Sequence, residues 1–100
     1  METVAQSVNG VFCVSGALEI YSADPVRMAL LDYLTSTSQP IVDLQAVSAC
    51  DPAGAQLLLA ANAAAAAAGK TLRYQNIAAP VRDIWLRLGL PETLPAPSVP

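Results

Sequence analysis

The chain has 100 residues, enough for one domain, and carries a net charge of −3 from eight acidic and five basic residues. The five cations are scattered, so the sequence argues against nucleic-acid binding, which needs a clustered basic surface. Histidine is absent, which removes the commonest general base and the commonest metal ligand. We therefore expect no metal site and no cofactor.

Charged residues make up only 13% of the chain, against about 25% in an average protein. Some uncharged surface should therefore be exposed, which suggests a partner protein or self-association as a homodimer. The first residues carry no basic region before a long apolar run, so we see no secretory signal and expect a cytoplasmic protein. The longest uncharged run, residues 52–69, is too short and too weakly apolar for insertion into a membrane.

The first third of the chain predicts a hairpin and a helix. Two short apolar runs, residues 4–8 and 11–15, are separated by Asn9-Gly10, a strong hairpin signal. A second apolar stretch, ALEIY (17–21), follows Gly16.

A helix is predicted over residues 22–34, because Val26, Leu30, Tyr33 and Leu34 recur at helical spacing. Ser22 or Asp24 can cap this helix, and Pro25 suits its first turn. The polar segment 35–40 should end it.

The second half alternates strands and helices. A buried strand is predicted over residues 41–47, and a long helix follows with Asp51 as N-cap, Pro52 at its first position and Gly69 after its last turn. Residues 71–77 alternate like a strand. A third helix, with Pro80 near its start, should carry Ile84, Trp85 and Leu88 on one face.

The resulting order, β-β-α-β-α-β-α, predicts right-handed crossovers and a parallel region beside the antiparallel hairpin. We expect an α/β fold: a small sandwich with a four- or five-stranded mixed sheet and helices mainly on one face. The domain should span residues 1–90. The tail 91–100, which holds four of the eight prolines, should be disordered.

Several of these segments together resemble the STAS domain, the fold of anti-sigma factor antagonists and sulfate-transporter tails. They are Asp43-Leu44, the turn 51–54, the leucines 57–59, residues 69–72, and Val81 through Trp85 to Gly89-Leu90. The front half is similar to chemotaxis-associated and MlaB-like short forms. The resemblance implies a small STAS-like sandwich.

The resemblance also implies a function. In this family a kinase phosphorylates a Ser or Thr in the turn, and the added charge at a helix N-terminus switches partner binding. Here Pro52 or Ala53 stands at that place, while Asp51 and Gly54 are kept. We therefore expect a protein-binding regulatory module, partnered by an anti-sigma factor, a kinase or a chemotaxis protein, and not switched at this turn. The alternative is a subunit that docks on the ATPase of an ABC-type lipid transporter.

An enzyme is disfavoured. Without histidine, the candidates for a nucleophile or base are Cys50, Asp51, the tyrosines Tyr21, Tyr33 and Tyr74, and the scattered lysine and arginine residues. The charge of Asp51 opposes thiolate formation at Cys50. We expect no catalytic residues.

The long helix has two faces at 3.6 residues per turn. One suits packing on the sheet. The other, together with Asp51, is predicted to bind a partner because it carries no charge; its residues are Ala55, Gln56, Leu59, Asn62, Ala63 and Ala66. The alternative is that alanine is simply the best helix former.

Overall fold

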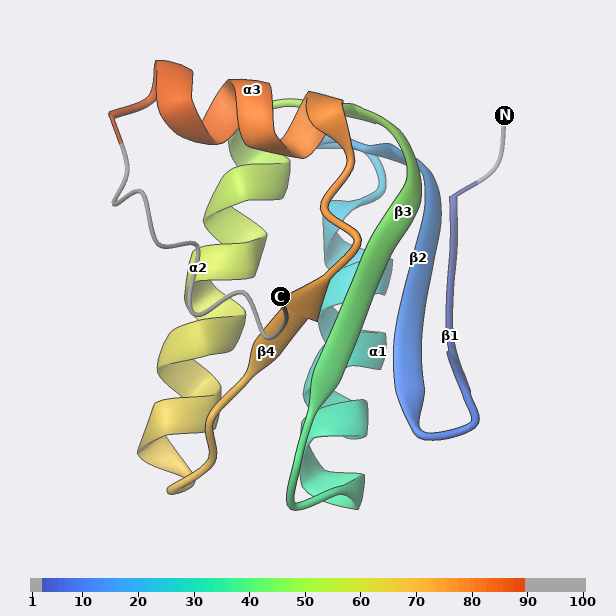
Figure 1. The fold of residues 1–100 in the computed structure, drawn as a ribbon, viewed down its shortest axis with the longest axis vertical. Helices are drawn as coiled ribbons and strands as arrows, with labels where there is room; N and C mark the ends of the chain where they lie inside the picture. Colours follow the sequence, from blue (N-terminus) through green and yellow to red (C-terminus); the bar gives the residue numbers. More distant parts are fainter. Residues whose placement is uncertain (1–2, 90–100) are drawn as a thin grey trace.

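A computed structural model describes residues 3–89, which form two layers: a four-stranded sheet and helices packed on one of its faces (Figure 1). The elements in chain order are β1 (Val4–Val8), β2 (Val11–Leu18), α1 (Ala23–Ser36), β3 (Ile41–Cys50), α2 (Pro52–Ala67), β4 (Arg73–Gln75) and α3 (Ala79–Arg87). None of these three helices is both long enough and apolar enough to cross a membrane.

The sheet has the order β1-β2-β3-β4 and is mixed, as predicted. β1 and β2 form the antiparallel hairpin, and Asn9 (φ 52°) and Gly10 (φ 84°) make the two-residue turn that this loop length favours. β2–β3 and β3–β4 pair in parallel, each joined by a crossover helix. α1 and α2 cover one face of the sheet, and α3 lies across the end of α2 (Figure 1).

The core lies between the sheet and the two long helices. The four α1 residues predicted from helical spacing are all buried, and β2 alternates between buried and half-buried positions along its eight residues. The remaining core comes from β3, α2, β4 and α3, with Leu44, Leu58, Tyr74 and Trp85 among its largest members. The opposite face of the sheet carries no helix (Figure 1).

Several predicted boundaries are wrong, and pairing explains most of them. β3 continues to Cys50 and not to residue 47, because its second half pairs with residues 16–18 of β2. β4 has only three of the seven predicted residues, and Asn76, at φ 52°, turns the chain out of the strand. α1 ends at Ser36, two residues later than predicted.

Three smaller predictions also need correction. The stretch 17–21 is no separate element, because Ala17 and Leu18 complete β2 and the rest forms a loop. Ser22 occupies the N-cap of α1, but its hydroxyl does not cap the helix. Leu88 lies at the C-cap of α3 and is 39% exposed, so it does not share the buried face of Trp85. The predicted tail, residues 91–100, lies outside the described residues.

Candidate functional site

The corner predicted from the sequence lies where the carboxyl ends of β2 and β3 meet. Leu18 and Cys50 are register partners at these two ends, so the loop into α1 and the turn into α2 start side by side. In an α/β sheet this edge is the usual place for a functional site. The structure therefore brings the 51–54 turn together with residues 19–22, which the sequence does not indicate.

Asp51 holds this corner with both carboxylate oxygens. Its Oδ1 accepts a hydrogen bond from the N–H of Gly54 (3.0 Å), which is the predicted N-cap interaction. Its Oδ2 accepts a second hydrogen bond, from the N–H of Ile20 (3.0 Å). The side chain thus joins the start of α2 to the loop before α1.

Gly54 lets α2 approach the sheet closely. A Cβ atom at this position would lie 2.3 Å from the carbonyl oxygen of Leu18 and 2.9 Å from the sulfur of Cys50. Since one of these atoms belongs to the backbone, no side chain fits without moving α2 away from β2. The glycine is needed for the packing of α2 on the sheet.

Two exposed apolar side chains beside the corner were not predicted. Ile20 is 64% exposed and Tyr21 is 94% exposed, although both lie in an apolar stretch. The hydroxyl of Ser22, which donates to the carbonyl of Ala17 (2.8 Å) and accepts from the N–H of Glu19 (3.0 Å), helps to hold this loop. A large exposed aromatic side chain is a common anchor in protein interfaces.

Part of the predicted outer face of α2 is exposed, and its role in partner binding stays a prediction. Gln56, Ala63 and Ala66 are exposed, and Leu59 and Asn62 are half-buried. The assignment of Ala55 to the outer face is wrong, because Ala55 is fully buried. α3 lies across this end of α2 (Figure 1) and contacts it.

Two other alanines, Ala60 and Ala67, are exposed and extend the face in its place. We call the exposed residues 56, 60, 63, 66 and 67 the alanine face. It contains no charged residue.

Asn62 stands at the edge of the alanine face. Its Oδ1 atom is buried and has no hydrogen-bond partner in the structure. A buried acceptor without a partner costs free energy, so this side chain is not explained by the stability of the fold.

The comparisons with known proteins agree with this geometry. A family model described as "Mlab, STAS domain" matches residues 1–95. The chain belongs to the STAS domain family. No curated protein matches it.

Solved STAS-type structures share the fold at low sequence identity. One is a putative anti-sigma factor antagonist from Thermotoga maritima, with a TM-score of 0.68 and 13% identity over 87% of this chain and 78% of that one. A second is the anti-sigma factor antagonist SpoIIAA in its unphosphorylated form (TM-score 0.64, 14% identity, 85% and 82% covered). A third is a Ser-to-Glu variant of RsbS from Moorella thermoacetica (TM-score 0.63, 19% identity, 91% and 80% covered).

The turn of this STAS domain has no hydroxyl. Pro52 is exposed at the first position of α2, Ala53 is half-buried behind it, and neither can accept a phosphate. Ser48 is exposed near the end of β3, before the turn.

Three of the side chains considered for catalysis, those of Cys50, Tyr74 and Tyr33, are buried or hydrogen-bonded within this STAS domain. Burial, together with the charges of Asp51 and Glu19, raises the pKa of the Cys50 thiol to about 11, so the thiolate is scarce at neutral pH. The Tyr74 hydroxyl donates to the carbonyl of Leu58 (2.9 Å), and burial raises its pKa. The Tyr33 hydroxyl accepts from the N–H of Ile41 (3.0 Å).

A polar cluster on the helix-free face also belongs to the fold. The Asp43 carboxylate accepts hydrogen bonds from Gln75 (3.0 Å), Asn76 (2.8 Å) and the N–H of Gln45 (2.9 Å). Partial burial acts to raise the pKa of Asp43, but these hydrogen bonds outweigh it and leave the pKa lowered. Among residues 3–89, no group of three or more His, Cys, Asp or Glu side chains could hold a metal ion.

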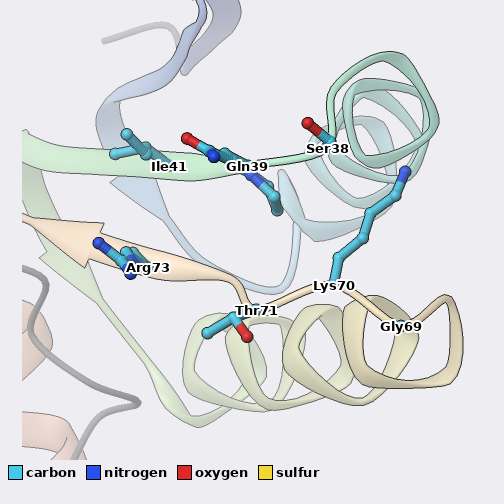
Figure 2. Close-up of a pocket in the computed structure, with 8 residues that line it drawn as sticks. Ser38, Gln39, Ile41, Gly69, Lys70, Thr71 and Arg73 are labelled. Atoms are coloured by element: carbon cyan, nitrogen blue, oxygen red, sulfur yellow. The ribbon is translucent and has the colours of Figure 1, made fainter.

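A hollow of about 310 Å³ lies at the opposite end of the sheet and contains Lys70 and Arg73 (Figure 2). Lys70 Nζ donates to the carbonyl of Leu34, at the end of α1. The two cationic side chains point in different directions (Figure 2), so they do not form one anion site.

Proposed function

We propose that this STAS domain is a non-enzymatic regulatory module of the bacterial cytoplasm, which binds a partner protein through the Asp51 corner and the alanine face. Phosphate on residues 51–54 does not control it. One observation carries the proposal: the corner keeps the Asp51 cap and the close Gly54 contact while its turn lacks a hydroxyl.

The exposed surface around the corner supports a partner. Ile20 and Tyr21 are exposed in the loop beside the start of α2, and the alanine face on α2 carries no charge. An exposed helix in a domain without a partner normally carries charged residues on its outer side. Anchors of this kind, surrounded by small residues, are typical of interface centres.

The partner class follows from what the chain resembles. Two of the similar structures are described as anti-sigma factor antagonists, and one of these was solved in its unphosphorylated form. We infer that the partner here is an anti-sigma factor, a kinase-like protein or a chemotaxis protein, and that the domain stays in the state equivalent to the unphosphorylated one.

A second function, docking on the ATPase subunit of a lipid transporter, is favoured by the family description, which names Mlab. The two functions differ in the protein that would be found on the same surface. Capture from a native lysate, with the full chain as bait and identification by mass spectrometry, separates them.

A charge placed in the alanine face tests the proposed surface. Ala63→Glu is the suitable variant, because Ala63 is exposed, whereas Leu59 is half-buried against the core and its replacement would also disturb folding. A glutamate at the centre of an interface is a buried, unpaired charge, so we expect binding of the captured partner to fall by at least about tenfold.

The matched control is Gln39→Glu, which adds the same charge at an exposed position of the loop before β3. Affinities of purified partner for wild type and both variants are compared by calorimetry. Equal affinity for Ala63→Glu and wild type, with both proteins folded, would show that the alanine face is only a good helix.

A further inference from the structure

β1 is an uncovered edge of the sheet. It pairs with β2 on one side, and no described strand pairs with its other side, which faces away from the rest of the molecule (Figure 1). Such an edge offers unpaired N–H and C=O groups to another chain, and proteins usually protect it with a charge, a proline, a bulge or a very short strand. β1 has five residues, VAQSV, without charge or proline, and its register with β2 is unbroken.

The other edge of the sheet is different. β4 has three residues and begins with Arg73, so it is short and carries a charge. Both features are recognised edge protections. The contrast shows that the missing protection is specific to β1.

We propose that β1 pairs with β1 of a second copy of this chain, antiparallel and about a two-fold axis at Gln6. The strand reads almost the same in both directions: valine at each end, a small residue next, and glutamine at the centre. Pairing centred on Gln6 places Val4 opposite Val8 of the second copy and Gln6 opposite its own equivalent. A two-fold interface requires this kind of self-complementarity.

The side chains of β1 fit this arrangement on both faces. Ala5 packs against the core, so alternation along the strand puts Val4, Gln6 and Val8 on the helix-free face. There the valines of the two copies would form apolar cross-strand pairs, and the two glutamine amides could bond to each other. On the helix-covered face the second copy would bring Ala5 and Ser7 of its strand, with its own α1 beside them.

The helix-covered face of β1 is only partly filled by α1. A hollow of about 350 Å³ lies between the two elements, and its lining includes Ala5, Gln6 and Ser7 of β1 and Ala29, Asp32 and Ser36 of α1. α1 therefore does not pack tightly over this strand. Asp32 is the one charged residue among these lining residues, and it belongs to α1, not to the strand.

The contact is small. Five residues of strand extend over about 17 Å, and interfaces below about 1,200 Å² are typical of weak complexes. We therefore expect a monomer–dimer equilibrium in the micromolar to millimolar range, not a permanent dimer. β1 and α2 lie on opposite sides of the molecule (Figure 1), so the pairing does not depend on the proposed function of the corner.

Sedimentation of the full chain tests the pairing, over concentrations from about 10 µM to about 1 mM to match weak association. Wild type should form dimers reversibly. Gln6→Lys would place two lysines opposite each other at the axis and should weaken dimerisation by at least about tenfold. The control Gln45→Lys makes the same change at an exposed position of β3, which lies inside the sheet between β2 and β4 and away from the β1 edge, and should leave dimerisation unchanged.

Opposite charges at position 6 of the two copies test whether the two-fold axis passes through Gln6. Gln6→Lys and Gln6→Glu should each be monomeric, and their equimolar mixture should dimerise at least as well as wild type. A wild type that stays monomeric at every concentration overturns the proposal. So does a folded Gln6→Lys variant that dimerises as well as Gln45→Lys, or a mixture that fails to restore association.

Discussion

The Asp51 carboxylate joins two parts of the chain, and the two bonds can be separated by substitution. Asp51→Ala removes both the cap on Gly54 and the bond from Ile20, and we expect a loss of about 2 kcal/mol in unfolding free energy. Asp51→Ser keeps a good N-cap but has one oxygen, so it should lose only about 1 kcal/mol. Urea unfolding measures both. Equal losses would mean that the bond to Ile20 adds nothing to stability.

A second prediction concerns the pH dependence that Asp43 creates. Its pKa is lowered in the folded protein, so the ionised form stabilises the fold. This contribution is present above the unfolded pKa, near 4, and is lost as the pH falls through the lower folded value. Asp43→Asn, which cannot ionise, should be less stable than wild type at neutral pH and should approach it in acid.

The measurement is urea unfolding of both proteins at a series of pH values from about 7 to about 2. A stability difference that stays constant over this range would show that the ionisation of Asp43 is not linked to folding.

The sequence predicts single-residue roles well where the partner is close along the chain. The cap from Asp51 to Gly54 spans three residues, and the Asp-Pro signal is enough to find it. The bond from Asp51 to Ile20 spans 31 residues, and only the meeting of β2 and β3 creates it. Ile20 and Tyr21 were therefore missed as part of the corner.

At the scale of elements, substitution of Asn62 tests whether this position of α2 serves the stability of the fold or the binding of a partner. Asn62→Ala removes a buried acceptor without a partner and adds the best helix former, so the protein should gain roughly 1 kcal/mol in unfolding free energy. The control Gln56→Ala, at an exposed position of the same helix, should change stability by only a few tenths.

The same Asn62→Ala variant should bind its partner less well, because a residue that lowers stability is expected at functional positions. Thermal unfolding and calorimetry give the two values. A variant with unchanged stability would mean that the Asn62 oxygen is already satisfied in solution.

The existence and type of all seven elements follow from hydrophobic spacing and turn residues, but their ends do not. The last part of β3 is polar or small, and it is a strand because residues 16–18 of β2 lie beside it. β4 is short because Asn76 leaves the strand conformation. Ala55 shows the same limit within a helix: its spacing assigns it to the outer face, but tertiary packing buries it completely.

At the scale of the whole molecule, two uncharged surfaces lie apart. The alanine face belongs to α2 and the open edge belongs to β1, on opposite sides of the fold (Figure 1). The sequence has few charged residues, which suggested a partner or self-association. These two surfaces are uncharged regions of the kind that this composition predicts. Under the two proposals, the alanine face binds a different protein and the β1 edge binds a second copy of the chain.

This separation predicts that changes at the two surfaces act independently. Ala63→Glu should weaken partner binding and leave dimerisation unchanged, and Gln6→Lys should do the reverse. In the double variant each affinity should equal that of the corresponding single variant to within about 0.5 kcal/mol, roughly a factor of two, because distant sites without shared contacts are additive. The measurements are sedimentation and calorimetry on wild type, the two single variants and the double variant, which together form a double-mutant cycle. If Gln6→Lys also reduced partner binding tenfold, the partner would need the dimer or would touch β1 itself, and the two surfaces would be one functional unit.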